Sequence, residues 1–397
     1  MDCTGRQSAG WIKLDLLSRG VEIDESVFAF LAATANVARR KNFYNTPIWG
    51  ETLSPPPQEL RVLGVVVGLN SYGVSPWRLS WSRDQNSLAL RNAAAGLEYT
   101  AEPLPDLHLF ARHPQCAKLA NLYGGAALAF FSPRTCYFFA DGTECSFCSL
   151  AGTAEETVGF KSHLSEADVQ TTVRTAFETD PERIEQIMIV GGNMRDLDRG
   201  FRHHVSLAAA AQTSLREAGR SGNVSVHIAT MPPRNLDLLS LLRDLENVHV
   251  MFNLEVWDPS VFADVCSGKQ KDYGREALIL ALKALRTAIG EYRAHSLLVT
   301  GIETAESTIT GARALAEMGV SPIINIYHSD RHSRLGLSVR PTFAYLAQIA
   351  HGVQELYDTY PLKPYWRNCG RNAIDSEASH GLFRSPVPQS LEKVTAC

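Results

Sequence analysis

The strongest constraint on the fold is an alternation of short apolar segments with amphipathic segments. It begins near residue 124 and is repeated six times. Short apolar runs, the expected strands, occupy residues 126–131, 186–192, 224–229, 248–255, 295–301 and 321–327. Amphipathic stretches, the expected helices, occupy residues 165–178, 204–219, 234–246, 274–290, 305–319 and 340–357. Strands that alternate with helices form parallel sheets, and their crossovers are right-handed. The pattern therefore predicts an α/β fold with a curved parallel sheet or an open barrel.

The segments on either side of this repeat have a different texture. Residues 1–123 contain a stretch with helical periodicity at 26–41, a proline-rich connection at 51–60 and a strand-like run at 60–73. They are predicted to form an N-terminal α+β extension. Residues 336–397 contain the last amphipathic helix and a loop-rich end, which are predicted to form a C-terminal cap. Residues 124–335 are then the core.

Composition narrows the class of partner. The formal net charge is −4, with 45% hydrophobic and 20% charged residues, which favours a well-packed globular protein and gives no electrostatic reason to bind nucleic acid or a membrane surface. The N-terminus lacks the pattern of a secretory signal, and no apolar run is long enough to cross a membrane. We therefore expect a cytoplasmic protein whose main partner is a small molecule.

Three of the eight cysteines lie close together, at Cys136, Cys145 and Cys148. They follow the first expected strand and precede the first helix, at the strand edge where sites of α/β proteins gather. Three thiolates can bind three irons of a cubane iron-sulfur cluster and leave the fourth iron open. Two alternatives stay open. One is a structural zinc site with a fourth ligand such as His113 or Cys116, and the other is a set of unliganded thiols.

Together, the cysteine loop and the six-unit repeat make the chain resemble the radical S-adenosylmethionine (SAM) superfamily. The final "CSFC" matches the family's loop, with Phe147 before the last cysteine, but eight residues separate Cys136 from Cys145 where the family normally has three. The resemblance implies a partial (β/α)6 barrel and two cofactors, a [4Fe-4S] cluster and SAM. It implies that Cys136, Cys145 and Cys148 are the cluster ligands, and Cys116 is the first candidate if Cys136 is not one.

The resemblance also implies which residues hold SAM. "VGGN" after the second strand would bind the amino group of its methionine part, while Asn253 and Glu255, on one face of the fourth strand, would meet its ribose or methionine part. Lys269 or Arg275 would neutralise its carboxylate, and the fifth strand would end against the adenine. The expected SAM-binding residues are Phe147, Gly191, Gly192, Asn193, Asn253, Glu255, Lys269, Arg275, Gly301 and Ile302.

Other strand-end and cap residues are candidates for the substrate side of the site. His227, Tyr327 and His328 are expected at strand ends that SAM does not use, as are Trp257 and Asp258. Cys369 in the loop-rich cap is a candidate hydrogen-atom donor or substrate clamp. These expectations give Cys369, Tyr327, His328 and His227 as candidate catalytic residues.

The activity that the resemblance implies is reductive cleavage of SAM to a 5′-deoxyadenosyl radical, which takes hydrogen from a small-molecule metabolite of specialised metabolism or cofactor biosynthesis. An external electron donor of the flavodoxin or ferredoxin type would supply the electron. Three alternatives remain. They are aminocarboxypropyl transfer with the same cofactors, a zinc-stabilised α/β protein without radical chemistry, and an iron-sulfur module that does not use SAM.

Overall fold

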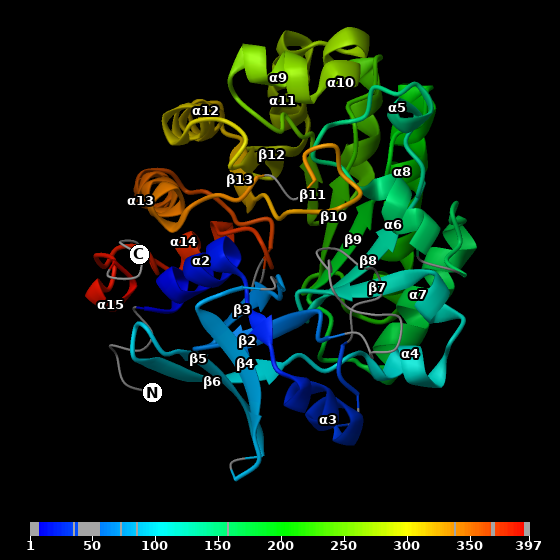
Figure 1. Ribbon diagram of the computed structural model, residues 1–397. Coiled ribbons are helices and arrows are strands. Elements are labelled where there is room, and N and C mark those ends of the chain that lie inside the picture. Colours follow the sequence, from blue (N-terminus) through cyan, green and yellow to red (C-terminus); the bar gives the residue numbers. More distant parts are fainter. Residues whose placement is uncertain are drawn as a thin grey trace.

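The computed structural model of the chain describes residues 8–34, 36–38, 56–71, 74–84, 86–156, 159–336, 339–366 and 370–392. These residues form two sheets, a curved one that carries the cysteine loop and a second one built from the N-terminal part (Figure 1). Within them, no helix is both long enough and apolar enough to cross a membrane.

The larger sheet confirms all six strands expected from the sequence. Its order is β13-β12-β11-β10-β9-β8-β7, and the six strands β8 to β13 run parallel while β7 pairs antiparallel with β8. The strands are β7 (Ala120–Tyr123), β8 (Ala127–Phe131), β9 (Gln186–Val190), β10 (Ser225–Ala229), β11 (Val248–Met251), β12 (Ala294–Thr300) and β13 (Ser321–Ile326). The expected α/β class is therefore confirmed.

The inner face of this sheet shows that it curls into a partial barrel. Side chains from five of its strands, Ala129, Met188, Ala229, Met251 and Ile323, form one buried cluster together with Tyr365 and Trp366 of the C-terminal part. Alternate residues face the same side of a strand, so these side chains mark one face of the sheet. This cluster is the interior of the open barrel.

A C-terminal segment fills the open side between β7 and β13. The ring of Trp366 stacks on the ring of Tyr123 in β7, with ring centroids 4.5 Å apart. On the other side, Ala373 forms a β-bridge with Asn325 of β13. Tyr365, which directly precedes Trp366 in the chain, is buried inside the barrel. The cap thus joins the two edges of the sheet.

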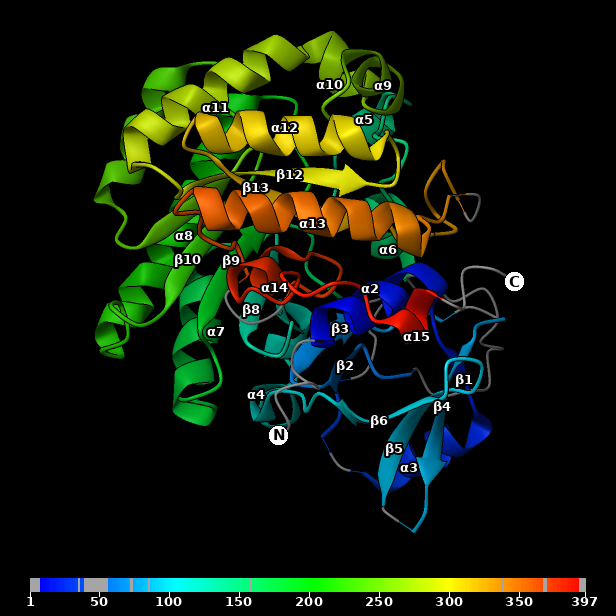
Figure 2. The same cartoon turned by 90° about the vertical axis from the view of Figure 1, so that its left-hand side faces the viewer.

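Helices cover the outer face, and α12 and α13 lie side by side on it (Figure 2). α7 begins with a capping box in which Ser165 and Asp168 bind each other's backbone amides, as its sequence indicates. The segment 234–246, expected as an α-helix, forms a 3₁₀ helix instead. The main elements are α7 (Glu166–Thr179), α8 (Leu197–Glu217), η2 (Leu236–Asp244), α11 (Arg275–Ile289), α12 (Ala305–Glu317) and α13 (Phe343–Thr359).

Shorter helices occupy the connections and the C-terminal end. They are α4 (His108–Arg112), η1 (Cys116–Lys118), α5 (Tyr137–Ala140), α6 (Leu150–Glu156), α9 (Pro259–Val265), α10 (Ser267–Asp272), α14 (Asp375–Ser379) and α15 (Gln389–Glu392).

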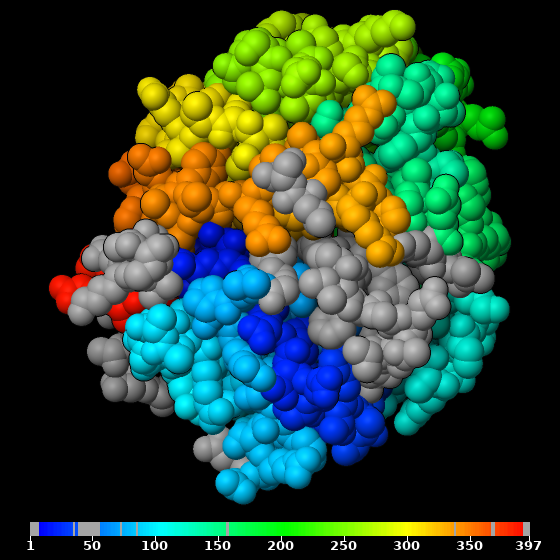
Figure 3. Space-filling view, in the orientation of Figure 1, coloured from blue at the N-terminus to red at the C-terminus, as the bar shows by residue number. Residues whose placement is uncertain are grey.

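The N-terminal part forms a six-stranded sheet in the order β1-β4-β5-β6-β2-β3. Its strands are β1 (Glu22–Ile23), β2 (Glu59–Val62), β3 (Val65–Gly68), β4 (Trp77–Ser82), β5 (Ser87–Asn92) and β6 (Leu97–Pro103), and its helices are α2 (Ala9–Arg19) and α3 (Glu25–Ala33). α2 packs between β3 and α13, so this part lies directly against the barrel (Figure 3). Lys13 of α2 and Glu377 of α14 form a buried ion pair, 2.7 Å long.

Candidate functional site

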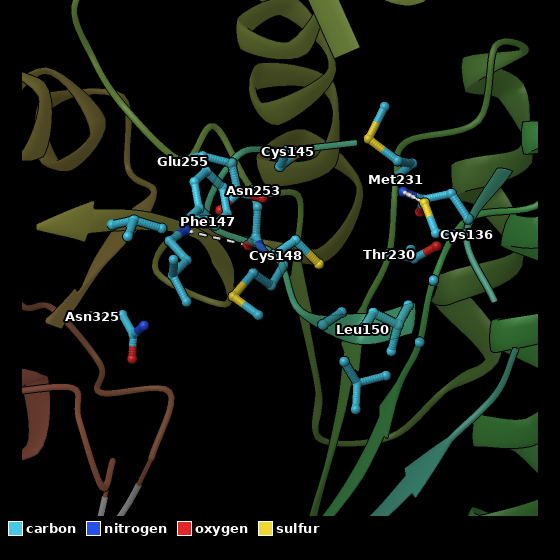
Figure 4. Close-up of a pocket in the computed structure, with 18 of the residues that line it drawn as sticks. Cys136, Cys145, Phe147, Cys148, Leu150, Thr230, Met231, Asn253, Glu255 and Asn325 are labelled. Carbon is cyan, nitrogen blue, oxygen red and sulfur yellow. Dashed lines mark hydrogen bonds between the residues drawn. The ribbon is translucent and has the colours of Figure 1, made fainter. Parts of the chain in front are cut away.

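The loop between β8 and α6 brings the three cysteines to the C-terminal ends of the parallel strands. Cys136 caps the N-terminus of α5, and Cys145 and Cys148 lie between α5 and α6. All three line a cavity of about 380 Å³, which we call the cysteine cavity (Figure 4). This volume lies within the usual range for small-molecule sites.

The first half of the loop packs directly on the end of β9, where "VGGN" lies. A Cβ on Gly191 would be 2.6 Å from the carbonyl oxygen of Pro133, and a Cβ on Gly192 would overlap the carbonyl oxygen of Thr135. The amide of Gly192 donates to the Pro133 carbonyl over 2.7 Å. Both glycines are therefore needed for this close approach of two backbones, a role that the sequence reasoning missed.

The second half of the loop packs on the junction of α9 and α10. The amide of Ser146 donates to the carbonyl of Val265 over 2.8 Å, and the amide of Gly268 donates to the carbonyl of Thr143 over 3.1 Å. A side chain on Gly268 would overlap Thr143. This contact was not predicted, and its only sequence signal is a glycine inside a helical segment.

The surroundings of the three thiols shift their pKa values in different directions. Burial, with repulsion from neighbouring thiolates, raises the pKa of Cys148 to about 12, and burial also raises the pKa of Cys136. A hydrogen bond from the Cys266 thiol, together with the charge of Lys269, lowers the pKa of Cys145. Bound iron would stabilise all three thiolates, because a coordinating thiol loses its proton.

The donor set fits a cluster with several irons. Among the described residues, no three His, Cys, Asp or Glu side chains converge as the ligands of one metal ion would. A structural zinc site needs four ligands on a single ion. A cubane cluster instead takes each thiolate on a separate iron, so three thiols spread around one cavity suit it.

Glu255 and Lys269 form a buried ion pair in the wall of the cysteine cavity. Glu255 Oε1 lies 2.5 Å from Lys269 Nζ, which also donates to the Asn253 carbonyl over 3.1 Å. Burial would lower the pKa of Lys269, but the Glu255 carboxylate raises it, so the amine stays charged. The backbone of Glu255 has φ +73°, a left-handed conformation that is strained for this residue type.

Nine of the residues expected to bind SAM or substrate line the cysteine cavity beside the three cysteines. They come from the cysteine loop, the ends of β9, β11 and β13, and α10, and in Figure 4 Asn325 and Cys136 lie on opposite sides of the view. The nine are Phe147, Gly191, Gly192, Asn193, Asn253, Glu255, Lys269, Tyr327 and His328.

Three other expected SAM-binding residues lie outside this lining. Arg275 donates to the carbonyl of Trp257 over 2.8 Å, and its guanidinium lies 4.6 Å from the Trp257 ring centroid. Gly301 has φ +110°, and a side chain there would overlap Pro341. Ile302 packs against the hydrophobic core. The structure does not bring these three to the cysteine cavity.

His227 lies inside the barrel, two residues before the cavity-lining end of β10. It is 1% exposed, its Nε2 lies 2.8 Å from Ser225 Oγ, and its ring stacks on that of His249. His249 Nδ1 in turn lies 2.9 Å from His295 Nε2. These histidines fill the barrel beneath the cysteine cavity. Cys369, another candidate catalytic residue, lies outside the described residues.

Tyr327 and His328 both face the cavity but have fixed partners. The Tyr327 hydroxyl lies 2.9 Å from Ser333 Oγ and donates to the Gly336 carbonyl over 3.0 Å. His328 Nδ1 lies 2.9 Å from Asn372 Nδ2. The amide group is a donor, so this contact makes Nδ1 the acceptor and leaves the ring proton on Nε2.

A second cavity, of about 360 Å³, adjoins the cysteine cavity. Both are lined by Phe147, Cys148 and His328, among other residues. The second cavity, called the side cavity here, extends toward the N-terminal sheet and the cap, and Gln58 and Arg371 line it. The sequence reasoning gave no function to the N-terminal part and gave the cap only the candidate role of Cys369, because nothing local in them indicates that they meet the cysteine loop.

No protein-family model matches the sequence, and no curated protein sequence matches it. Solved structures do align with the chain. Methylornithine synthase (PylB) aligns with 13% identity and a TM-score of 0.44, over 63% of this chain and 67% of the other. Coproporphyrinogen III oxidase (HemN) from Escherichia coli, described as a radical SAM enzyme, aligns with 15% identity and a TM-score of 0.37, over 63% of this chain and 55% of the other.

A third aligned structure is TsrM from Kitasatospora setae, described as a radical S-adenosylmethionine methyltransferase with cobalamin and a [4Fe-4S] cluster bound. It aligns with 13% identity and a TM-score of 0.34, over 49% of this chain and 37% of the other. The chain thus spans at most about two thirds of the length of these proteins. Because the TM-scores of these structures are below 0.5, the activity of the chain is inferred from its own site and not from them.

Proposed function

We propose that the chain is a radical SAM enzyme that acts on a small molecule. The observation that carries this proposal is that Cys136, Cys145 and Cys148 line one cavity with the buried Glu255–Lys269 pair, at the C-terminal ends of the parallel strands. In α/β folds this edge is where ligands bind. Thiolates for a cluster and polar groups for a charged ligand thus share one cavity.

The cysteine loop would hold the cluster, and its backbone contacts would position it. Two separate elements support the loop, the end of β9 at Gly192 and the start of α10 at Gly268. Asn193 Nδ2 donates to Cys136 Sγ over 3.6 Å, a hydrogen bond of the kind that tunes an iron-sulfur cluster. The wide spacing between Cys136 and Cys145 is taken up by α5, which lets both thiols reach the cavity.

Polar groups beside the thiols would hold SAM. Asn253 and Glu255 line the cavity from the segment after β11, and Lys269 faces them from α10. An ammonium suits the amino acid carboxylate of SAM, while a carboxylate or amide oxygen suits its ammonium and ribose hydroxyls. Phe147, next to Cys148, offers a flat apolar surface to the adenine.

When bound, the reduced cluster would supply one electron, received from an external donor, to break the S–C5′ bond of SAM. The products would be methionine and a 5′-deoxyadenosyl radical, which would take a hydrogen atom from the substrate. The task of this chain's residues is to bind, orient and exclude water. The barrel interior beneath the cavity suits this task, because Met188, Ala229 and Met251 form an apolar floor. A reactive radical is thereby kept away from bulk solvent.

The test is anaerobic reconstitution with iron and sulfide, followed by dithionite and SAM. Wild-type protein should bind about four irons, as a [4Fe-4S] cluster requires, and should release 5′-deoxyadenosine. Cys145→Ala should lose both properties. Cys116→Ala is the matched control and should keep both properties. Cys116 is buried outside the cavity, where its side chain forms a hydrogen bond with Thr172.

The products and the metal content separate the alternatives. 5′-Methylthioadenosine in place of 5′-deoxyadenosine would show aminocarboxypropyl transfer with the same cofactors. An iron cluster that does not bind SAM in calorimetry would indicate an iron-sulfur module. Colourless protein with one zinc per chain after anaerobic purification and reconstitution would overturn the proposal.

A further inference from the structure

We propose that the side cavity binds an acidic group of the substrate, a carboxylate or a phosphate, through Arg134 and Arg371. This proposal rests on the proposed function in one respect only, because it takes the reacting part of the same molecule to lie in the adjoining cysteine cavity. Arg134 lies in the first part of the cysteine loop, and Arg371 belongs to the cap. Both line the side cavity.

The charge of the lining is the first argument. Among the described residues that line the side cavity there are two arginines and no aspartate or glutamate. Arg134 and Arg371 are largely buried, with Arg134 8% exposed. Glu59, which forms an ion pair with Arg371, is not among these lining residues. Two guanidinium groups in the described lining favour an anion over a cationic ligand.

The position of Arg371 is fixed from several sides. Its Nε lies 3.0 Å from Oε1 of the buried Glu59, and its guanidinium lies 4.8 Å from the ring centroid of Tyr123. Glu59 is held in turn by the amide of Gly124, which donates to it over 3.0 Å. An arginine that pairs through Nε presents its planar fork in a set direction, which suits two-point binding of a carboxylate or phosphate.

The backbone around Arg371 adds an independent sign of function. Arg371 has φ +53°, a left-handed conformation that is uncommon for a long side chain. Its neighbour Asn372 is tied to β13, because its carbonyl accepts from the Ile326 amide over 2.9 Å and its side chain contacts His328. Strained residues that are held this firmly gather at ligand sites.

Arg134 lines the side cavity from the segment that follows β8. Its backbone amide donates to the Ser162 carbonyl over 3.0 Å, and its guanidinium lies 4.5 Å from the Phe160 ring centroid. Arg134 lies two residues before Cys136, so an anion bound there is close in the chain to the cluster loop. Binding of the acidic group would thus fix the rest of the substrate relative to the cysteine cavity.

One polar atom in the lining indicates a donor group on the same ligand. Oδ1 of Asn121 is buried and makes no hydrogen bond among the described residues. Asn121 lines the side cavity and pairs across the sheet with Ala129, whose side chain faces the barrel interior. Buried acceptors without a partner are rare in proteins, so a hydroxyl or amino group of the ligand would satisfy this one. The expected substrate is therefore a small acid with a hydroxyl or amino group.

The test measures anion binding without SAM or a reductant, by equilibrium dialysis and thermal unfolding. The probes are inorganic phosphate and glycolate, each titrated against chloride at constant ionic strength. Wild-type protein should bind at least one of them saturably. Phosphate binding would indicate a phosphorylated substrate, and glycolate binding would indicate a hydroxy acid.

Arg134→Gln should weaken this binding by about tenfold or more, because a hydrogen-bonded charged donor is lost. Arg371→Lys keeps the positive charge opposite Glu59 but loses the planar guanidinium that donates at two points, and it should also weaken binding. Arg202→Gln, at an exposed position on α8, is the matched control and should bind as wild type does. Circular dichroism establishes that each variant is folded.

Absence of saturable binding of both probes, or equal binding by folded Arg134→Gln and wild-type protein, would overturn the proposal. Neither result bears on SAM cleavage, which is measured separately by 5′-deoxyadenosine release. Conversely, the protein could bind an anion in a way that depends on Arg134 and yet fail to cleave SAM. That result would support the anion site and overturn the radical SAM function.

Discussion

Glu255 and Lys269 face each other across 2.5 Å in the wall of the cysteine cavity, and both side chains are under 10% exposed. Loss of one partner would leave a buried charge without compensation. We expect Lys269→Met to lower the free energy of unfolding by about 3–5 kcal/mol in urea titrations. The double variant Glu255→Gln/Lys269→Met should recover much of this loss, because neither charge then remains.

The matched control for this ion pair is Arg91→Gln. Arg91 pairs with Glu98 over 3.0 Å, but both side chains are about half exposed. Surface pairs contribute at most about 1 kcal/mol. Equal destabilisation by Lys269→Met and Arg91→Gln would contradict the assignment of a buried pair at the site.

Gly192→Ala should impair cluster assembly without a change in any candidate ligand. A Cβ there overlaps the carbonyl oxygen of Thr135, so the cysteine loop must move away from β9. The measurement is iron per chain after anaerobic reconstitution. Gly222→Ala is the control, since its Cβ would meet no atom within 4 Å. Full iron content in folded Gly192→Ala would show that the contact with β9 does not position the loop.

Arg334→Gln should speed the loss of iron while it changes stability little. Arg334 Nε lies 2.6 Å from Glu144 Oε1, and its Nη2 donates to the Gly142 carbonyl over 2.7 Å, so it holds the cysteine loop from outside. The Arg334 side chain is about half exposed, which limits the expected stability loss to about 1 kcal/mol. Iron release to a chelator measures the effect. A release rate equal to that of Arg313→Gln, a variant at another exposed pair, would refute it.

Stability should fall as the pH rises between about 4 and 7 because of Asp375. Burial, with repulsion from Glu377, raises the pKa of Asp375 to about 7 from a usual value of 3.8. The folded protein therefore binds a proton that the unfolded chain has lost, and this contribution is complete below the unfolded pKa and gone above the folded one. A shift of about three pKa units corresponds to about 4 kcal/mol.

Urea unfolding of wild-type protein and Asp375→Asn at a series of pH values tests this prediction. Asp375 Oδ2 accepts from the Tyr365 amide over 2.8 Å, and the asparagine oxygen can keep this bond. The variant should therefore fold and lose the slope that Asp375 contributes. The same slope in both proteins would mean that Asp375 is ionised in the folded state at neutral pH.

The strands and the cysteine loop could be predicted because their signals are local. An apolar run such as 186–192 needs only its own residues to indicate a buried strand, and Ser165 with Asp168 specifies a helix start within four positions. The segment 234–246 shows the limit of this reasoning. Its leucines fit a helix, but its capping residue Asn235 opens a short 3₁₀ helix that packs against α11.

The parts of the site that were missed depend on contacts between distant segments. No local pattern indicates that Gly268 meets Thr143, or that Arg371 pairs with Glu59. His227 shows a related difficulty. Alternation along β10 gives the face of the sheet correctly, but the depth of a side chain within the barrel depends on the register of β10 with its neighbours.

The ion pair between Lys13 and Glu377 joins residues 364 positions apart in the chain. The barrel edges at Tyr123 and Asn325 are likewise joined through Trp366 and Ala373. Contacts of such long sequence separation slow folding, because much of the chain must be ordered before they form. The two ends of the chain and the barrel are thus expected to unfold in a single cooperative transition, and an isolated fragment of residues 124–335 would lack the groups that cover its edges.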